Sequence, residues 1–271
     1  MAGTLTLVGG GKMGGALLAG WLDRGTDPAS VVIVEPFEAA RDDIAANHGV
    51  PVAASADDLA ADHRPEVIVF AVKPQDMAAV APSYRRFVDA APVFLSIAAG
   101  TTIAFFEKHL GANAAIVRSM PNTPAAVRRG ITVACPNGHV SAAQRERCDG
   151  LLAAVGEVAW IDDEGLLDAV TGVSGSGPAY VFLLAECMAE AGVAAGLPPD
   201  LAARLANATV AGSGELLRLA DDGPDVLRKN VTSPGGTTAA ALEVLMAADA
   251  MPAVLREAIA AATKRSRELA G

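Results

Sequence analysis

Near its N-terminus the chain reads Thr4-Leu-Thr-Leu-Val8, an apolar strand, then Gly9-Gly-Gly11-Lys-Met-Gly14 and a helical run to about Arg24. This order lets backbone N–H groups at a helix N-terminus face a pyrophosphate. Gly9 can make the tight turn, Gly11 can let the phosphate approach, and Gly14 can let helix and strand pack closely. Glycine triplets also occur in plain turns, but the strand before and the helix after this one favour dinucleotide binding.

The composition of the 271-residue chain excludes several classes of protein. Apolar residues make up 52% of it, which excludes disorder as a global description, and the low aromatic content of 4% predicts a core of Ala, Val and Leu. The formal net charge is −10. A basic stripe is needed to neutralise nucleic-acid phosphates, so we expect no nucleic-acid partner.

The three cysteines, Cys135, Cys148 and Cys187, are widely spaced and form no CxxC or CxxH pair. This pattern predicts a reduced protein with small buried thiols and no metal site. No basic region with an apolar leader precedes the first strand, and no stretch of about 20 residues lacks charges. We therefore expect a cytoplasmic protein with no membrane partner.

Strand-like segments alternate with helical ones over the first 160 residues or so. One helix is predicted from Ser141, as N-cap, to Val155. A sheet of six strands is predicted, and the strand-like segments that could form it are Thr4–Val8, Val31–Val34, Val50–Ala53 as the third, Val67–Val72 as the fourth, Val93–Ile97, Ile131–Ala134 and Glu157–Ile161. The alternation predicts an α/β fold, with a Rossmann-like doubly wound parallel sheet that ends near residue 162.

The second strand ends at Glu35, 21 residues beyond Gly14. A carboxylate at this position of a dinucleotide fold can accept hydrogen bonds from both adenosine ribose hydroxyls, and it would repel a 2′-phosphate. Glu35 by itself therefore favours NADH. Arg41 could offset this preference if Glu35 turns away, and a solvated acid at a strand end is the alternative interpretation.

Loops at the ends of the other strands supply further candidates for cofactor contacts. Ser55 and Lys73 could reach the cofactor, or they could be a turn residue and a surface lysine. Asn122 lies between two prolines and could meet a carboxamide, or it could cap its own backbone. The predicted cofactor contacts outside the first turn are Glu35, Ser55, Val72, Lys73, Pro74, Ala98, Gly100 and Asn122; within it they are Gly9, Gly11, Lys12, Met13 and Gly14.

From Asp162 onward the pattern becomes helical. Helices are predicted at Leu166–Thr171, from Pro178 to about Gly192, from Pro199 to about Leu219, after Gly235 and from Pro252. The Pro178 helix is apolar almost all round and must be buried on every side. A homodimer, in which these helices pack against a second copy, meets that need.

Two segments of this half carry unusual composition. Thr171-Gly-Val-Ser-Gly-Ser-Gly-Pro178 places glycines in helical sequence, where each costs up to about 1 kcal/mol relative to Ala, so a kink or a close approach to a cofactor is expected. Asn230-Val-Thr-Ser-Pro-Gly-Gly-Thr-Thr238 feeds a helix with free N–H groups predicted at Gly236, Thr237 and Thr238. Such a turn is an anion site without Lys or Arg and suits a carboxylate.

At these two segments the chain resembles the pyrroline-5-carboxylate reductases, enzymes of the last step of proline synthesis. The resemblance covers nearly the whole chain, and its last two motifs are specific to the family. Its motifs are Gly9-x-Gly11-x-Met13, Val72-Lys-Pro-Gln75, Met120-Pro-Asn-Thr-Pro124, Asp168-Ala-Val-Thr-Gly172, Ser174-Gly-Ser-Gly-Pro-Ala-Tyr180 and Val231-Thr-Ser-Pro-Gly-Gly-Thr-Thr238.

The resemblance implies an NAD(P)H-binding domain over residues 1–162 and a helical dimerisation and substrate-binding domain over residues 163–271. It implies a site between them that borrows residues from the dimer partner, and often an assembly of five dimers into a homodecamer. Glu35-Pro36-Phe37 stands where many members hold the NADPH phosphate with small hydroxyl or basic residues. The choice between NADPH and NADH therefore stays open.

The implied reaction is hydride transfer to the ring C=N carbon of Δ1-pyrroline-5-carboxylate, giving L-proline. Such a site needs orientation more than a strong acid. All four histidines, His48, His63, His109 and His139, lie outside the motifs and are expected at the surface.

Residue roles follow from the resemblance. The substrate carboxylate is assigned to Val231, Ser233, Gly236, Thr237 and Thr238, and Asn230 would bridge cofactor and substrate. Thr171 and Ser176 would face the nicotinamide, although helix hydroxyls usually bond their own backbone. Glu164 could face the cationic nitrogen of the substrate, or it could stabilise the helix that follows it.

Two other functions stay open at this point. A β-hydroxyacid dehydrogenase shares the two-domain plan, but those enzymes use a lysine at the start of the second domain, and no lysine occurs here between Lys108 and Lys229. A cofactor-sensing binding protein would keep the glycine turn and lack the chemistry. The intact carboxylate-type turn argues against it.

Overall fold

The computed structural model describes residues 4–270, which form eight strands and eleven α-helices. The strands are β1 Thr4–Val8, β2 Val31–Val34, β3 Val52–Ala53, β4 Pro65–Phe70, β5 Val93–Ser96, β6 Ala115–Met120, β7 Gly130–Pro136 and β8 Gly156–Trp160. The helices are α1 Lys12–Asp23, α2 Glu38–His48, α3 Met77–Val80, α4 Ile103–Leu110, α5 Ala142–Ala153, α6 Leu167–Val170, α7 Gly177–Ala194, α8 Pro199–Leu219, α9 Pro224–Asn230, α10 Thr237–Leu245 and α11 Met251–Ala270.

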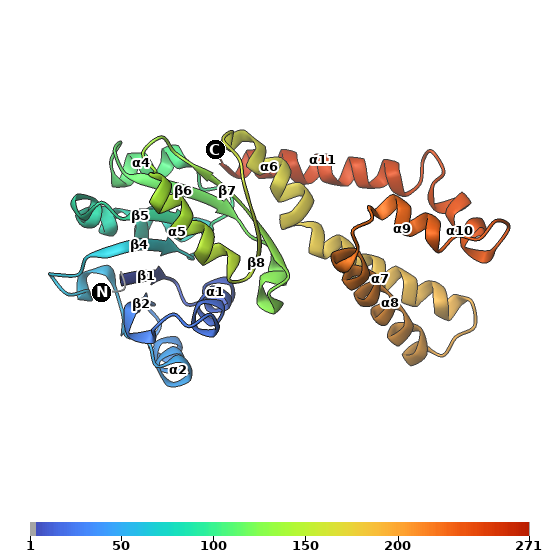
Figure 1. Ribbon diagram of the computed structural model, residues 1–271, viewed down its shortest axis with the longest axis horizontal. Coiled ribbons are helices and arrows are strands. Elements are labelled where there is room, and N and C mark those ends of the chain that lie inside the picture. Colours follow the sequence, from blue (N-terminus) through green and yellow to red (C-terminus); the bar gives the residue numbers. More distant parts are fainter. Residues whose placement is uncertain (1–3, 271) are drawn as a thin grey trace. The chain divides into compact units, whose positions relative to one another are not determined.

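The eight strands form one sheet in the order β3-β2-β1-β4-β5-β6-β7-β8 (Figure 1). β1 to β6 run parallel, and the chain reverses its direction of winding between the neighbours β1 and β4. In open α/β sheets ligands bind at such a switch point, outside the carboxyl ends of the strands. The predicted Rossmann-like sheet, followed by helical sequence, is confirmed.

The parallel arrangement does not extend to the last two strands. β7 pairs antiparallel with β6, and β8 then runs parallel to β7. A parallel crossover needs about a dozen residues or more, and usually a helix. Only residues 121–129 join β6 to β7, and they hold the short 3₁₀ turn Thr123–Val127. The prediction of six parallel strands is thus corrected to eight strands, two of them reversed.

Apolar side chains pack on both faces of the sheet. On one face Leu17 and Trp21 of α1 and Leu152 of α5 cover the sheet. On the other face Tyr84, from the 3₁₀ segment Ala81–Ala90, and Phe106 of α4 pack together. Parallel strands buried in this way read as continuous apolar runs, which is why they were recognisable in the sequence.

The chain divides into two compact units, residues 1–175 with 262–271, and residues 176–261. This division differs from the predicted boundary after residue 162. Leu167 of α6 is buried in the core of the first unit. Near the end of α11, the Ser266 hydroxyl donates a hydrogen bond to Asp168 Oδ1 (2.6 Å), so both segments belong to that unit.

The second unit is built from helices. α7 and α8 lie side by side (Figure 1), and α8 has the predicted bounds. The seven-residue α9 was not predicted, because so short a helix carries little periodic signal. None of the described helices is long and apolar enough to cross a membrane.

Helix α7 leaves large apolar side chains exposed. The exposed side chains on α7 include Val181, Phe182, Leu183, Leu184 and Met188. Large apolar side chains exposed in such number on one helix indicate an interface. Cys187 on the same helix is also exposed, so the predicted burial of the thiols holds for Cys135 and Cys148 only.

Candidate active site

The glycine turn after β1 is held against β2 and β4. The Gly9 N–H donates to Val34 O (2.8 Å), and Gly9 adopts φ +98°, a left-handed conformation that favours glycine. A Cβ at Gly9 would lie 2.9 Å from Ala71 O, and one at Gly14 would lie 2.2 Å from Gly9 O. The predicted backbone roles of Gly9 in the turn and Gly14 in helix packing are therefore confirmed.

The middle of the turn is open. Gly11 is the N-cap of α1 and is exposed, and no described atom lies within 4 Å of the position of a Cβ there. Lys12 is exposed as well, whereas Met13 packs against the core. The N–H groups of the first turn of a helix lack partners within that helix. This opening fits an anionic group such as a pyrophosphate.

Glu35 joins the glycine turn to the end of β2. Its carboxylate is buried, with the residue 6% exposed, so the alternative of a solvated acid is wrong. Oε2 accepts the Gly10 N–H (2.9 Å), and Oε1 accepts the Phe37 N–H (3.2 Å). The sequence pattern did not reveal this bond to Gly10. Contact of Glu35 with a ribose stays a prediction.

Arg41 is attached to the same corner through backbone carbonyls. Its Nη1 donates to Glu35 O (3.0 Å) and to Pro36 O (2.8 Å). A cation and a carboxylate thus lie at the β2 end, where a dinucleotide fold places the adenosine ribose.

The loops after β4 and β5 lie at the same edge of the sheet as the glycine turn. Val72 is half-buried and Lys73 is exposed, and Pro74 begins the 3₁₀ turn Pro74–Asp76. Ala98 is buried. Gly100 has φ +73°, and a Cβ there would lie 3.5 Å from Leu269 O of α11, so the chain itself approaches this glycine closely.

Ser55 and Asn122 have structural partners. The Ser55 N–H and hydroxyl donate to Asp58 Oδ2 (2.9 and 2.8 Å), and Asn122 Oδ1 accepts the Ile131 N–H (2.9 Å). The alternative of a turn residue is thus confirmed for Ser55, whereas Asn122 does not cap its own turn and instead accepts a bond from β7. Their contacts with a cofactor stay predictions.

Glu164 has a role that sequence reasoning missed. Its Oε1 accepts the Ile103 N–H at the start of α4 (2.9 Å) and a hydrogen bond from Arg118 Nη1 (2.7 Å). Arg118 is buried in β6, 5% exposed, and the signal for it was a lone arginine inside an apolar strand. Glu164 thus links β6 to the start of α4, and it also lies in the first turn of its own helical segment Glu164–Leu166, as the alternative predicted. Contact of Glu164 with a cationic substrate nitrogen stays a prediction.

Cys135 lies near this ion pair and is not a nucleophile. Burial first, and then the Glu164 carboxylate, raise the pKa of the Cys135 thiol to about 11. The thiol is therefore protonated near neutral pH.

The glycine-rich helical segment contains the expected irregularity, since Thr171–Gly175 forms a π-helical turn between α6 and α7. Thr171 Oγ1 donates to Leu167 O (2.8 Å), so this hydroxyl bonds its own backbone, as helix hydroxyls usually do. A Cβ at Gly175 would lie 2.5 Å from Met120 Cε. Ser176 precedes α7 directly. That Thr171 and Ser176 face a nicotinamide stays a prediction.

In the second unit, the segment from Asn230 to Thr238 joins α9 to α10. Asn230, Val231 and Ser233 are exposed. The Gly236 N–H donates to Ser233 O (3.0 Å) within the turn, so the prediction that this N–H is free is wrong. Thr237 and Thr238 begin α10, and their N–H groups belong to its first turn.

The histidines lie outside these loops, but His48, His63 and His109 are half-buried rather than fully exposed, and only His139 among the four is exposed as predicted. His63 is half-buried, and its Nε2 lies 2.8 Å from the hydroxyl of the buried Thr6 in β1. Burial lowers the pKa of His63 from its ordinary value. A polar neighbourhood in sequence gave no sign of this tertiary contact.

The residues of the glycine turn, of the loops after β4 and β5 and of the turn before α10 are suited to orienting ligands. They supply backbone N–H groups, hydroxyls, amides and one carboxylate tied to the glycine turn. In each unit, loops of this composition suit the positioning of a ligand, which is the part a protein takes where a cofactor carries the chemistry.

Known proteins match the chain over nearly its full length. A family model described as "Pyrroline-5-carboxylate reductase dimerisation" matches residues 164–269, and one described as "NADP oxidoreductase coenzyme F420-dependent" matches residues 4–100. Pyrroline-5-carboxylate reductase from Pseudomonas aeruginosa is 40% identical over 98% of this chain and 96% of that protein.

Solved structures agree. A pyrroline-5-carboxylate reductase from Coxiella burnetii has a TM-score of 0.94 at 32% identity and covers 100% of both chains. A Plasmodium falciparum pyrroline carboxylate reductase with NADP bound has a TM-score of 0.83 at 29% identity, covering 100% of this chain and 99% of that one. With its glycine turn, its π-helical segment and its second-unit turn before α10, the chain belongs to the pyrroline-5-carboxylate reductase family.

Proposed function

We propose that this protein reduces Δ1-pyrroline-5-carboxylate to L-proline with NAD(P)H, as the last step of proline synthesis. The observation that carries the proposal is that one chain of this family holds both an open glycine turn at Gly11 and a serine–threonine turn at the start of α10. The first suits a dinucleotide phosphate and the second suits the carboxylate of a small substrate.

A bound nicotinamide dinucleotide supplies the hydride for the C=N carbon. The chain's own residues hold and orient the reactants. Gly9, Gly11 and Gly14 shape the turn for the pyrophosphate, together with Lys12 and Met13. We assign the remaining cofactor contacts to Glu35, Ser55, Val72, Lys73, Pro74, Ala98, Gly100, Asn122 and Asn230. Thr171 and Ser176 are assigned to the nicotinamide side.

The substrate carboxylate is assigned to the turn before α10. Its donors are the N–H groups of Thr237 and Thr238 and the hydroxyls of Ser233 and Thr238, with Val231 beside them. Gly236 shapes this turn through its bond to Ser233 O and is not a donor to substrate. Negative charge at a helix N-terminus is stabilised by about 0.3–1 kcal/mol, which adds to these hydrogen bonds.

The organisation and location of the protein complete the proposal. Self-association follows from the dimerisation domain, and the exposed apolar side chains of α7 suit a homodimer interface. Assembly of five dimers into a homodecamer rests on the resemblance alone. We assign cofactor binding to residues 1–162, and dimerisation and substrate binding to residues 163–271. The three cysteines, none in a disulfide, support the cytoplasm as the location.

The first test measures initial rates of cofactor oxidation with pyrroline-5-carboxylate, using NADH and NADPH in parallel, for the wild type and Glu35→Ser. We expect turnover with NADH preferred, because the buried Glu35 carboxylate repels a 2′-phosphate. In Glu35→Ser the ratio of kcat/KM values should move toward NADPH by about tenfold, which corresponds to about 1.4 kcal/mol. No turnover with either cofactor would reject the proposed function.

The second test addresses the carboxylate turn. Thr238→Ala should raise KM for the imine about tenfold and leave KM for the cofactor unchanged, because one hydrogen bond to a charged group contributes about 1.5 kcal/mol. Thr232→Ala is the matched control, since the Thr232 hydroxyl donates to Arg228 O within the same segment. An unchanged imine KM in Thr238→Ala would remove Thr238 from the substrate site.

A further inference from the structure

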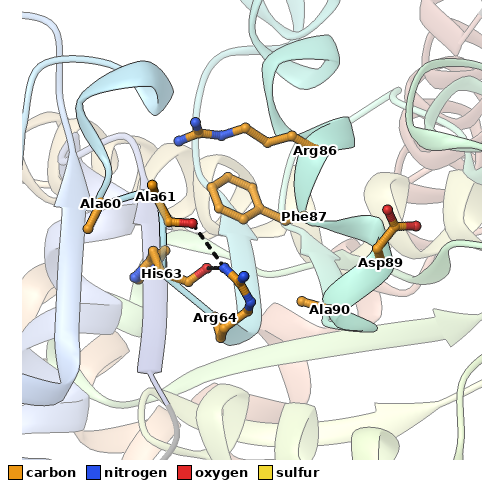
Figure 2. A pocket seen from close by; sticks show the side chains of 8 residues that line it. All are labelled: Ala60, Ala61, His63, Arg64, Arg86, Phe87, Asp89 and Ala90. Atoms are coloured by element: carbon orange, nitrogen blue, oxygen red, sulfur yellow. Dashed lines mark hydrogen bonds between the residues drawn. The ribbon is translucent and has the colours of Figure 1, made fainter.

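A hollow lies at the amino edge of the sheet, the edge opposite the glycine turn. It has a volume of about 480 Å³ and is formed by the loop before β4 and by the end of the 3₁₀ segment before β5 (Figure 2). The first supplies Ala60, Ala61, His63 and Arg64, and the second supplies Arg86, Phe87, Asp89 and Ala90. None of the predicted cofactor or substrate contacts lines this hollow.

The hollow carries cationic groups in a chain whose formal net charge is −10. Arg64 and Arg86 line it from the two segments, with His63 beside them. Both guanidinium groups are held in place by backbone carbonyls: Arg86 Nη2 donates to Ala56 O and Leu59 O, and Arg64 Nη1 donates to Ala61 O and His63 O. A fixed guanidinium recognises oxyanions better than a mobile one, because less rotamer entropy is lost on binding.

Arg86 retains donors for a ligand. Of its five N–H hydrogens, those on Nε and Nη1 have no protein acceptor among residues 4–270. Its Cζ lies 4.7 Å from the centroid of the Phe87 ring, which fixes the plane of the guanidinium against an apolar surface.

The remainder of the lining is apolar apart from one acid. In Figure 2 the Phe87 ring lies between His63 and Asp89, and Ala60, Ala61 and Ala90 complete the wall. The ring meets the His63 imidazole edge-on at 5.8 Å. A second negative group on a ligand would approach the Asp89 carboxylate, so the arrangement disfavours dianions.

We infer that this hollow binds a small organic monoanion, with its oxyanion group at Arg64 and Arg86 and a short apolar body against the exposed alanines Ala60, Ala61 and Ala90. The site is separate from the reaction that we propose for the carboxyl edge. It would provide a place for a carboxylate metabolite to bind without competing with cofactor or substrate.

His63 offers a direct reporter of occupancy. Its pKa is lowered by burial and then by Arg86, while Asp62 raises it and Arg64 lowers it. An anion in the hollow would offset the two arginines and raise the pKa of His63. Occupancy would thus be visible in a group that takes no part in the proposed reaction.

The experiment follows the His63 imidazole by NMR in the full chain labelled with ¹³C-histidine, with His63→Gln used to assign the signal. Butyrate, glutarate and inorganic phosphate are the probes, each added at millimolar concentration and low salt. We expect butyrate to raise the pKa of His63, with at least fivefold weaker responses to glutarate and phosphate. Added salt should weaken binding, because the attraction is partly screened.

Variants distinguish a built site from general charge. Arg64→Gln and Arg86→Lys should each weaken butyrate binding at least fivefold. Arg86→Lys keeps the positive charge and tests the guanidinium geometry, so it remains informative even where Arg64→Gln perturbs its loop. Arg85→Gln is the control, since Arg85 is exposed like Arg64 and Arg86 but does not line the hollow. An unshifted His63 with every probe, or equal losses in Arg85→Gln, would overturn the inference. Equal affinity for butyrate and phosphate would overturn its apolar part.

Discussion

Gly14→Ala is expected to lower the free energy of unfolding by about 3 kcal/mol, the upper range for forcing extra atoms into a packed interior. The new Cβ would lie 2.2 Å from Gly9 O, a backbone atom that cannot rotate away. Relief requires α1 to move off β1, and that movement displaces the glycine turn. We therefore also expect KM for the cofactor to rise at least about tenfold. Urea unfolding and initial rates measure the two effects.

Two neighbouring glycines are matched controls for this change. A Cβ at Gly15 would lie 3.8 Å from Gly10 O, an ordinary contact, so Gly15→Ala should stabilise the protein by about 0.5–1 kcal/mol. Gly11→Ala meets open space in the structure. It should keep the wild-type stability and raise only the cofactor KM. Wild-type stability of Gly14→Ala would contradict the close packing of α1 on β1.

The glycine turn was predictable because its signal is local. A strand, a φ that favours glycine and a helix start are all encoded within residues 4–24, and backbone sterics leave few alternatives there. The same holds for α5, whose N-cap Ser141 and capping partner Gln144 are three residues apart.

What the sequence did not reveal depends on partners far along the chain. Arg118 and Glu164 are 46 residues apart, and the Glu35 carboxylate bonds Gly10, 25 residues before it. The reversed direction of β7 follows from a short connection whose meaning appears only once β6 is recognised as its neighbour. The Gly236 N–H was a different kind of error, because its acceptor, Ser233 O, is local and lies within the same turn.

Glu164→Ala is expected to destabilise the protein by about 3 kcal/mol, since removing one member of a buried pair leaves the other charge uncompensated. The Arg118 side chain is 7% exposed and the Glu164 side chain 29% exposed, so the loss falls at the low end for buried pairs. The change also removes the acceptor for the Ile103 N–H at the start of α4. Urea unfolding measures the loss of stability, and we expect the slope of the unfolding free energy against urea concentration to stay unchanged.

Two further variants separate the buried charge from general effects of removing a carboxylate. Adding Arg118→Met to Glu164→Ala should recover most of the lost stability, because the uncompensated charge is then gone and a methionine fills the apolar strand. Glu268→Ala removes the exposed partner of Arg265 and should cost less than about 0.5 kcal/mol. If the double variant were as unstable as Glu164→Ala, the cost would lie in the lost bond to α4, and Glu164 would act mainly as the cap of that helix.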